Sequence, residues 1–453
     1  MSRRSNLDMV GPFLERACAG TAPIEASSMP PATVLARPGN RVISDGSALR
    51  EDPFMPRLIA DRPVLRMTSE LGRVMAAAEA RQRAGQKVLH LERGEPDFDT
   101  PAHIVEALAA AARSGETHYP DARGTNTLRG ALRDKLAREN GMRCEPDDIV
   151  ITNGGTHALF IAFQALLGPE DEILVLSPHW MAIPKLVALA HRATLRAVPA
   201  YLDVNGGTLD PAGLARRLAV AVGPRTRGIY LNTPNNPTGA VLARDHLAAI
   251  AALALERDLW VVSDEAYEHL LFDDARHVSI ASLPGMAERT LTAFTFSKSY
   301  AMTGWRVGYL ASPPALRDVV GPLLAFYTTH GVFPAAQAAA LAAVTGPQDA
   351  VAVMRSAYQE RRDLLLAGLA GSGVRVPPPR GAFYAFADVT AALGGRDVWG
   401  LIDEWLALGL AALPGTAFGA DYGGWVRLSL AARREDIADA AAVLRNRYAA
   451  VRA

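Results

Sequence analysis

The sequence predicts an α/β fold with a mostly parallel sheet, and the alternation of its segments is the main reason. Short runs rich in β-branched and aromatic residues, such as 172–178 and 259–267, alternate with Ala- and Leu-rich stretches such as 244–258. Strand–helix–strand alternation of this kind indicates parallel strands joined by helices. The continuous apolar character of these runs fits strands that are covered on both faces.

Length and composition are the second observation. The 453 residues suffice for more than one domain, and 49% of them are apolar, as in globular proteins. The formal net charge is zero, so we expect neither a nucleic-acid surface nor a membrane anchor, and no stretch reaches transmembrane length. The two cysteines, Cys18 and Cys144, exclude a disulfide scaffold. We expect a cytoplasmic protein without a metal site.

Local patterns give the individual elements. Helices are expected over 69–85, which is amphipathic and ends at glycine, and over 156–168 and 244–258. Besides the two runs above, strands are expected over 148–152, 194–200, 227–234, 290–297 and 305–311. Residues 20–40 are rich in Pro, Ala and Ser without a helical or strand period, so 1–61 is expected to be an extended or poorly ordered arm. It could also wrap over a neighbouring subunit.

A glycine pair follows the first strand of the alternating region, in "NGGTHAL" (153–159), and opens a helix. Such a turn exposes backbone N–H groups at the positive end of the helix dipole, which makes a phosphate cradle. Gly155, Thr156 and His157 would supply it. An ordinary strand–helix turn explains the pattern equally well.

Polar side chains follow two further strands. Asp264 comes directly after a buried strand, with Tyr267 three residues later. A buried carboxylate needs a cationic partner or several donors, and a pyridinium nitrogen would be such a partner, although Asp264 could simply cap a helix. The Pro-rich turn "NTPNNPTG" (232–239) holds an asparagine at another strand end, or is only a turn.

The stretch "TFSKSYAMTGWR" (295–306) places Lys298 after an apolar run. A lysine held there would lose hydration, its pKa would fall, and its amine would become a nucleophile, whereas the alternative is a solvated surface lysine. Arg306 could grip a phosphate with two hydrogen bonds. With the phosphate cradle and Asp264, these residues describe a pyridoxal phosphate (PLP) site.

From about residue 65 to its C-terminus, the chain resembles the class I/II aminotransferases of the fold type I (aspartate aminotransferase-like) PLP superfamily. The motifs "GEPDFDTP" (94–101), "NNPTG", "SDEAYEHL", "SKSYAMTGWRVGY" and "RGAFY" occur in the family's order and spacing. The resemblance implies a large PLP-binding domain over 101–344 and a smaller α+β domain made from 62–100 and 345–453.

The resemblance also implies roles around the cofactor ring. Lys298 resembles the lysine that forms the Schiff base and moves the α-proton, and Asp264 resembles the partner of the pyridinium nitrogen. Asn236 and Tyr267 resemble the pair that hydrogen-bonds the phenolic oxygen. Trp180 resembles the aromatic residue stacked on the ring.

Other matched positions would bind phosphate and substrate. Arg306, Thr295 and the backbone at Thr156 and His157 would hold the phosphate. Tyr119 resembles the tyrosine that reaches the phosphate of the neighbouring subunit, which implies a homodimer with shared sites.

Arg427 resembles the arginine that binds the substrate α-carboxylate, with Gly94 beside it. The alternative interpretation is that Arg427 is a surface arginine on a strand.

Three positions bear on the amino donor. Thr156 stands where some relatives carry lysine, the segment 323–334 holds Phe326, Tyr327 and His330 where others place arginine, and Leu71 replaces a polar residue. A second carboxylate therefore has no obvious partner, and we expect a neutral or aromatic donor. His330 and His179 are polar candidates for that pocket, or satisfied structural histidines.

The resemblance therefore implies an aminotransferase that moves the amino group of an L-amino acid to a 2-oxo acid. The same scaffold supports other chemistry, so carbon–sulfur lysis, cyclisation, β- or γ-replacement or annulation in specialised amino-acid metabolism stays open. A PLP-binding transcription regulator is a further alternative. The N-terminal arm is too short and too Pro-rich for a winged helix-turn-helix, and the chain lacks a basic patch.

Overall fold

The computed structural model describes residues 41–44, 47–51 and 69–449. The chain divides into two compact units, 1–61 and 62–453. In the first unit, β1 (Arg41–Ser44) and β2 (Ser47–Glu51) pair antiparallel, a hairpin that the composition of this segment did not predict. The remainder of the expected N-terminal arm lies outside the described residues.

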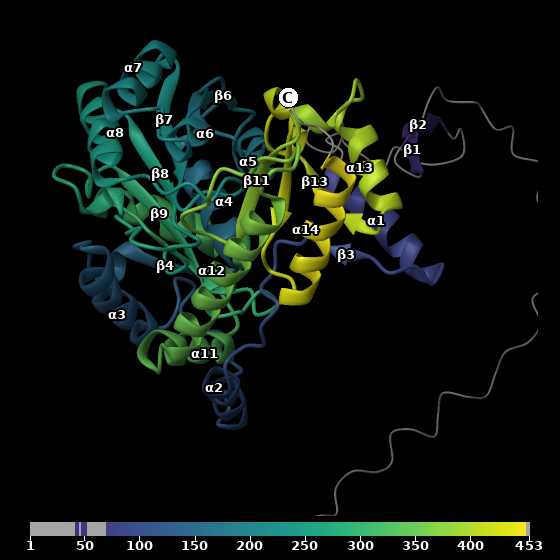
Figure 1. Ribbon diagram of the computed structural model, residues 1–453. Helices are drawn as coiled ribbons and strands as arrows, with labels where there is room; N and C mark the ends of the chain where they lie inside the picture. Colours follow the sequence, from purple (N-terminus) through teal and green to yellow (C-terminus); the bar gives the residue numbers. More distant parts are fainter. Residues whose placement is uncertain (1–40, 45–46, 52–68, 450–453) are drawn as a thin grey trace, which may run out of the picture. The chain divides into compact units, whose positions relative to one another are not determined.

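A seven-stranded sheet with the order β4-β10-β9-β8-β7-β5-β6 forms the centre of the second unit (Figure 1). Five strands are parallel: β5 (Glu172–Ser177), β6 (Thr194–Pro199), β7 (Thr226–Asn232), β8 (Trp260–Asp264) and β9 (Thr290–Thr295). The strand β10 (Gly308–Ala311) runs antiparallel to β9 and to β4 (Ile149–Thr152). The predicted α/β fold with a mostly parallel sheet is confirmed.

Both faces of this sheet are buried, because successive side chains of a strand point to opposite faces. Leu174 and Leu176 of β5 belong to a core cluster with residues of α7 (Pro211–Ala221) and α8 (Arg244–Glu256). Ile173 and Val175 belong to another cluster, with residues of α4 (Gly155–Leu166), α5 (Ile183–Leu189) and α10 (Arg317–Thr328). Figure 1 shows α7 and α8 together beside the sheet.

Further helices complete this part of the unit. The helices α2 (Ala102–Arg113) and α3 (Asn126–Lys135) both pack on α11 (Pro334–Thr345). Two short helices, α6 (Tyr201–Asn205) and α9 (Phe296–Ser299), follow β6 and β9 directly. No helix of the described residues is long and apolar enough to cross a membrane.

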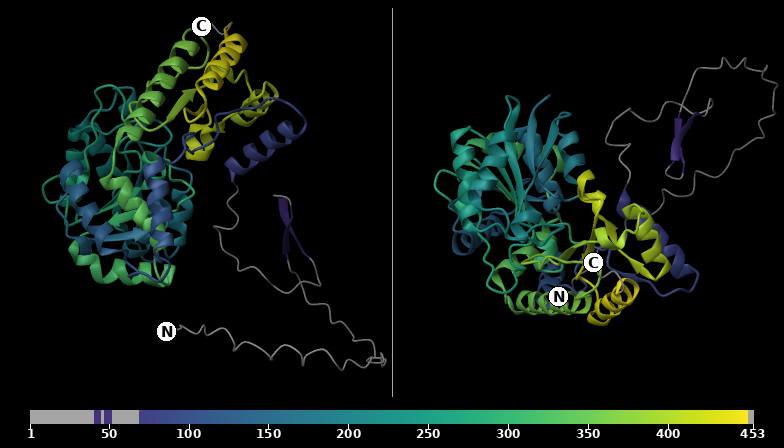
Figure 2. Two further views of the ribbon diagram at one scale, coloured as in Figure 1. Left: turned by 90° about the horizontal axis from the view of Figure 1, so that it is seen from below. Right: turned by 45° about the horizontal axis from the view of Figure 1, so that its top comes forward.

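Segments from both ends of the second unit form smaller sheets. β11 (Tyr384–Asp388), β14 (Trp425–Ser429) and β13 (Leu413–Pro414) pair antiparallel, and β12 (Leu410–Ala411) pairs with β3 (Leu89–His90). Around them lie α1 (Glu70–Arg83), α12 (Asp349–Leu369), α13 (Val398–Ala407) and α14 (Arg434–Tyr448). Figure 2 shows α12 and α14 packed side by side. The three-part domain division stays a prediction.

The expected elements occur, with changes at their ends. The helix expected over 69–85 begins after Ser69, whose hydroxyl accepts a hydrogen bond from the Gly72 N–H at 3.1 Å. The strand expected over 305–311 begins only at Gly308, because Arg306 has a φ of +56°, which is incompatible with a strand. The strand expected over 259–267 ends at Asp264.

Gly308 allows β10 to pass close to the glycine turn before α4. A Cβ at Gly308 would lie 2.7 Å from both the Gly154 carbonyl carbon and the Phe294 carbonyl oxygen. We expect Gly308→Ala to lower the free energy of unfolding by about 1–3 kcal/mol, measured by urea denaturation, because backbone must move. Gly130→Ala on α3 is the control, since a Cβ there meets nothing within 4 Å. Equal effects of the two substitutions would contradict the prediction.

Candidate active site

A cavity of about 730 Å³ lies at the carboxyl ends of β7, β8 and β9, where Asn232, Asp264 and Thr295 are the last strand residues. Ligands bind at this edge in parallel α/β sheets. The other lining residues are Leu71, Met75, Arg93, Gly94, Glu95, Gly155, Thr156, Leu159, Trp180, Met181, Asn236, Ala266, Tyr267, Ser297, Lys298, Thr303, Gly304, Arg306, Tyr384 and Arg427.

Lys298 reaches the cavity from α9, which begins directly after β9. Its Nζ donates a hydrogen bond to the Gly94 carbonyl oxygen at 2.7 Å. Burial lowers the pKa of Lys298 to about 8; the Glu95 carboxylate opposes this shift and the Arg427 guanidinium adds to it. A substantial fraction of the amine is therefore neutral and nucleophilic near pH 8.

Asp264 ends the buried strand β8. The Tyr230 hydroxyl donates to its Oδ2 at 2.9 Å, and the Ala266 N–H donates to its Oδ1 at 3.3 Å. Burial raises the pKa of Asp264 to about 6 in spite of these hydrogen bonds. Among the described residues no cation forms an ion pair with this carboxylate, so a cationic ring nitrogen would suit it.

Arg427 enters from β14 and is fully buried. Its Nη2 donates to the Glu92 carbonyl oxygen at 2.7 Å, and its Nη1 donates to the Asn236 Oδ1 at 3.2 Å. The guanidinium lies 4.3 Å from the centre of the Tyr384 ring. Its Nε is buried without a partner among the described residues, so a bound carboxylate would satisfy an N–H that is otherwise costly to bury.

The glycine turn and Arg306 form an anion cradle. Gly154 has a φ of +83°, and a Cβ there would lie 2.5 Å from the Arg306 Nη2. Arg306 Nη1 is held by the Thr303 carbonyl oxygen at 2.7 Å. Gly155 begins α4, and the N–H groups of a helix's first turn have no acceptor within the helix. These donors suit a phosphate.

Twelve of the residues singled out from the sequence line this one cavity; they are Leu71, Gly94, Gly155, Thr156, Trp180, Asn236, Asp264, Tyr267, Thr295, Lys298, Arg306 and Arg427. Tyr119, Phe326 and His330 do not line it. Tyr119 is 79% exposed and stacks on the His330 ring, with 3.9 Å between ring centres. Phe326 is 80% exposed.

The two other histidines considered from the sequence also lie outside the cavity lining. The backbone N–H of His157 donates to the Gly154 carbonyl oxygen at 3.1 Å, and its Nδ1 accepts from the Asn153 N–H at 3.2 Å. Its N–H is therefore already used within the turn. His179 is buried, with its Nδ1 3.2 Å from the Trp180 carbonyl oxygen.

Sequence reasoning missed several residues of the site. Tyr230 lies two residues before Asn232 on β7, so the strand period could have placed it on the same face of the sheet. Tyr384 belongs to the quoted "RGAFY" motif. Glu95 belongs to the quoted "GEPDFDTP" motif, and the Thr303 hydroxyl donates to it. Arg93 precedes this motif in an irregular segment that offers no periodic signal.

Most of the chain matches a known protein family. The family "Aminotransferase class I and II" matches residues 86–444. The chain belongs to this family. It is 40% identical over 371 residues to the aspartate/prephenate aminotransferase of Thermus thermophilus, covering 80% of this chain and 92% of that protein. It is 38% identical over 365 residues to an arginine–pyruvate transaminase of Pseudomonas aeruginosa, covering 80% and 90%.

Solved structures agree. The aspartate aminotransferase of Thermus thermophilus with maleate superposes with a TM-score of 0.79 at 38% identity, covering 88% of this chain and 100% of that one. The aromatic aminotransferase of Pyrococcus horikoshii gives a TM-score of 0.75 at 36% identity, covering 82% and 98%.

The protein is thus a PLP-dependent aminotransferase, and the cavity fits its cofactor. Within residues 69–449 the Asp264 carboxylate forms no ion pair, so a pyridinium nitrogen would supply its cationic partner. The absence of a side chain at Gly154 lets the Arg306 guanidinium lie against the glycine turn, where it would face a phosphate. Lys298 offers a partly neutral amine between them.

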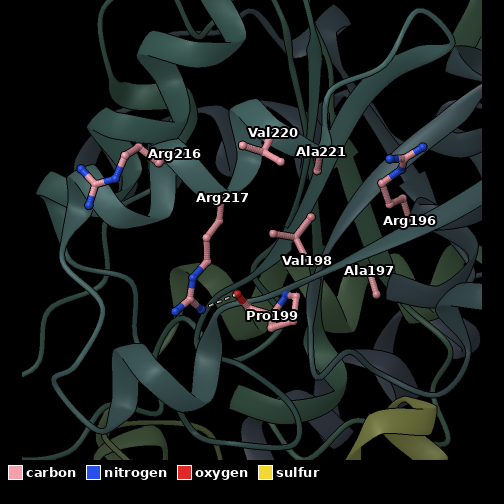
Figure 3. A pocket seen from close by; sticks show the side chains of 8 residues that line it. All are labelled: Arg196, Ala197, Val198, Pro199, Arg216, Arg217, Val220 and Ala221. Atoms are coloured by element: carbon pink, nitrogen blue, oxygen red, sulfur yellow. Dashed lines mark hydrogen bonds between the residues drawn. The ribbon is translucent and has the colours of Figure 1, made fainter.

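Two other features of the described residues do not form a reaction site. A second hollow of about 550 Å³ on β6 and α7 contains three arginines and apolar residues, without a carboxylate or nucleophile (Figure 3). Arg217 Nη1 donates there to the Pro199 carbonyl oxygen at 3.0 Å.

The second feature is a group with metal-ligand spacing: Glu265, Glu268 and His277. His277 Nε2 lies 2.7 Å from Glu265, and Lys135 Nζ lies 2.5 Å from Glu268. A lysine ammonium therefore already supplies the positive charge.

Lys298 should destabilise the cofactor-free protein. The pKa of Lys298 is about 8 in the folded protein and 10.5 ordinarily, so folding disfavours its ammonium form. The resulting loss of folding stability is fully present below about pH 8 and disappears as the pH rises towards 10.5. We expect Lys298→Met to raise the unfolding free energy of cofactor-free protein by about 2 kcal/mol at pH 7, and by less at pH 9.5. Denaturant unfolding at both pH values measures this.

Lys135→Met is the matched control. Lys135 is also buried but pairs with Glu268, so its removal should destabilise by about 3–5 kcal/mol. Destabilisation by Lys298→Met at pH 7 would contradict the expected cost.

Proposed function

We propose that this aminotransferase transfers the amino group of a neutral or aromatic L-amino acid to a 2-oxo acid, with Lys298 as the Schiff-base lysine. The observation that carries the proposal is the meeting of Lys298, Asp264 and Arg427 in one cavity. An amine, a buried carboxylate and a buried guanidinium provide the three polar contacts that an amino-acid substrate on PLP requires.

Lys298 is the group that moves the proton at the substrate Cα. The hydrogen bond to the Gly94 carbonyl oxygen holds its Nζ in the cavity, and its lowered pKa allows both proton acceptance and proton donation near neutral pH. Bound PLP supplies an electron sink for the charge that develops at this carbon.

Four residues orient the cofactor ring. Asp264 would hold the ring nitrogen, and the Tyr230 hydroxyl fixes the Asp264 carboxylate. Asn236 and Tyr267 would hydrogen-bond the phenolic oxygen. The Oδ1 of Asn236 accepts from Arg427, which leaves its amide N–H groups for this purpose, and the Tyr267 hydroxyl lies 3.3 Å from the Tyr384 hydroxyl. Trp180 lines the cavity and would stack on the ring.

Arg306, Thr295 and the backbone of Gly155 and Thr156 hold the phosphate, with His157 at the edge of the turn. Tyr119 belongs to the phosphate site of a second subunit in a homodimer. Its ring stacks on His330 and is 79% exposed, so it is accessible to another chain. We place the enzyme in the cytoplasm, where its two cysteines would stay reduced.

The apolar wall of the cavity supports a neutral or aromatic donor. Leu71 and Met75 reach it from α1, together with Met181. Thr156 brings no charge to the start of α4. The names of the relatives include aspartate/prephenate, arginine–pyruvate and aromatic aminotransferases, so the donor cannot be taken from the family.

Replacing Arg427 tests whether its guanidinium binds the substrate α-carboxylate. Lysine keeps the charge but loses the planar two-point geometry. We expect Arg427→Lys to reduce kcat/KM by about tenfold to a hundredfold for every amino acid, mainly through KM, because a charge-assisted pair is weakened. Steady-state kinetics with several donors measures it. A loss confined to one donor would argue against an α-carboxylate role.

The donor itself is found with a panel of L-amino acids. Loss of the visible absorbance of the PLP-loaded protein, with one 2-oxo acid released per site, is the expected result for neutral or aromatic donors. Lys298→Ala, as the control, should show neither change. A changed spectrum without 2-oxo acid release would favour lyase or replacement chemistry. Preference for an acidic donor would contradict the proposed donor class.

A further inference from the structure

The loop that carries Arg306 has a strained backbone. This Arg306 loop (residues 300–307) connects α9, which bears Lys298, to β10. Ala301 has a φ of +51° and Arg306 a φ of +56°, in the left-handed region that residues other than glycine rarely adopt. Such a conformation persists only where surrounding contacts hold it, so the contacts of the loop decide whether Arg306 stays in place.

One side chain from another segment contacts the Arg306 loop close to both strained residues. Thr100 belongs to the support segment (residues 94–100), which lies between β3 and α2. Its hydroxyl donates a hydrogen bond to the Ala301 carbonyl oxygen at 2.6 Å and accepts one from the Trp305 Nε1 at 3.0 Å. A single hydroxyl therefore links the first residue with a positive φ to the residue directly before Arg306.

A second link between the support segment and the loop lies at the cavity. The Thr303 hydroxyl donates to the Glu95 carboxylate, and the Thr303 carbonyl oxygen accepts from Arg306 Nη1 at 2.7 Å. Thr303 thus connects the guanidinium to the support segment. The same segment presents the Gly94 carbonyl oxygen to Lys298 Nζ at 2.7 Å. One short stretch of chain therefore holds both the amine and the residue that holds the guanidinium.

The support segment is itself anchored to α12. Asp97 forms an ion pair with Arg361 Nη1 at 2.7 Å, and this nitrogen also donates to the Leu430 carbonyl oxygen at 3.2 Å. Phe98 packs edge-on against the Tyr358 ring, with 5.7 Å between the ring centres. None of these partners belongs to the Arg306 loop. The segment is therefore fixed independently of the loop that it contacts.

We propose that Thr100 is a positioning residue for the cofactor phosphate, because it holds the Arg306 loop in the conformation that keeps the Arg306 guanidinium at the glycine turn. The proposal rests on the proposed function, in which Arg306 binds this phosphate. Thr100 does not line the cavity, so it acts through the loop and not by contact with the cofactor. Loss of its hydroxyl should weaken phosphate binding and leave the contacts of Asp264 with the ring unchanged.

The test compares two ligands that differ only in the phosphate group. Binding of pyridoxamine 5′-phosphate and of pyridoxamine to cofactor-free protein is measured by fluorescence titration for wild type, Thr100→Val and Thr100→Ser. Valine keeps the shape of threonine without its hydroxyl, and serine keeps the hydroxyl. We expect Thr100→Val to lower the affinity for the phosphorylated ligand by about tenfold and that for pyridoxamine by less than about twofold, because two hydrogen bonds of the loop are lost. Thr100→Ser should retain most of the wild-type preference.

Thr345→Val is the matched control. The Thr345 hydroxyl also donates to a backbone carbonyl oxygen, that of Leu341 at 2.8 Å, but both residues belong to α11. We expect this substitution to change neither affinity. Equal losses for the two ligands in Thr100→Val, or an unchanged preference for the phosphorylated one, would overturn the role of Thr100.

Arg306→Met separates this inference from the proposed function. We expect it to remove most of the preference for the phosphorylated ligand. If Arg306→Met keeps the wild-type preference, the proposed phosphate role of Arg306 is wrong, and the role of Thr100 falls with it. If Arg306→Met loses the preference while Thr100→Val keeps it, only the role of Thr100 is refuted.

Discussion

The whole site depends on burying Lys298 without a carboxylate of its own. Its Nζ donates a hydrogen bond to the Gly94 carbonyl oxygen and forms no ion pair with the described residues, and burial lowers its pKa to about 8. Lys135 of α3 is also buried, but its charge is compensated because it pairs with Glu268. A buried lysine without such a partner is costly, and that cost is what makes its amine reactive.

The seven-stranded sheet and the smaller sheets both contribute residues to the cavity that contains Lys298. The parallel strands present Asn232, Asp264 and Thr295 at one edge. The β14 strand and the segment after β3 bring Arg427 and Gly94 to the same place, although 333 residues separate them in the sequence (427 − 94). The cavity therefore exists only when both ends of the described unit have folded.

The sequence predicted the mostly parallel sheet well, because buried parallel strands are continuous apolar runs and their alternation with helices indicates parallel pairing. It also located Lys298 and Asp264, since a polar residue directly after such a run is conspicuous. The predicted strand ends were less accurate. The strand β10 begins only at Gly308 because Arg306 has a positive φ, and no side-chain pattern in the sequence indicates this. The hairpin of residues 41–51 likewise has no periodic signal.

The residues that escaped prediction were those whose place depends on three-dimensional contacts. Tyr230 bonds Asp264 across two strands, and Arg93 reaches the cavity from an irregular segment. Thr156, the segment 323–334 and Leu71 together suggested a pocket without a second cation. The structure supplies one from a different element, so the charge of a pocket follows from every segment that lines it and not from one aligned position.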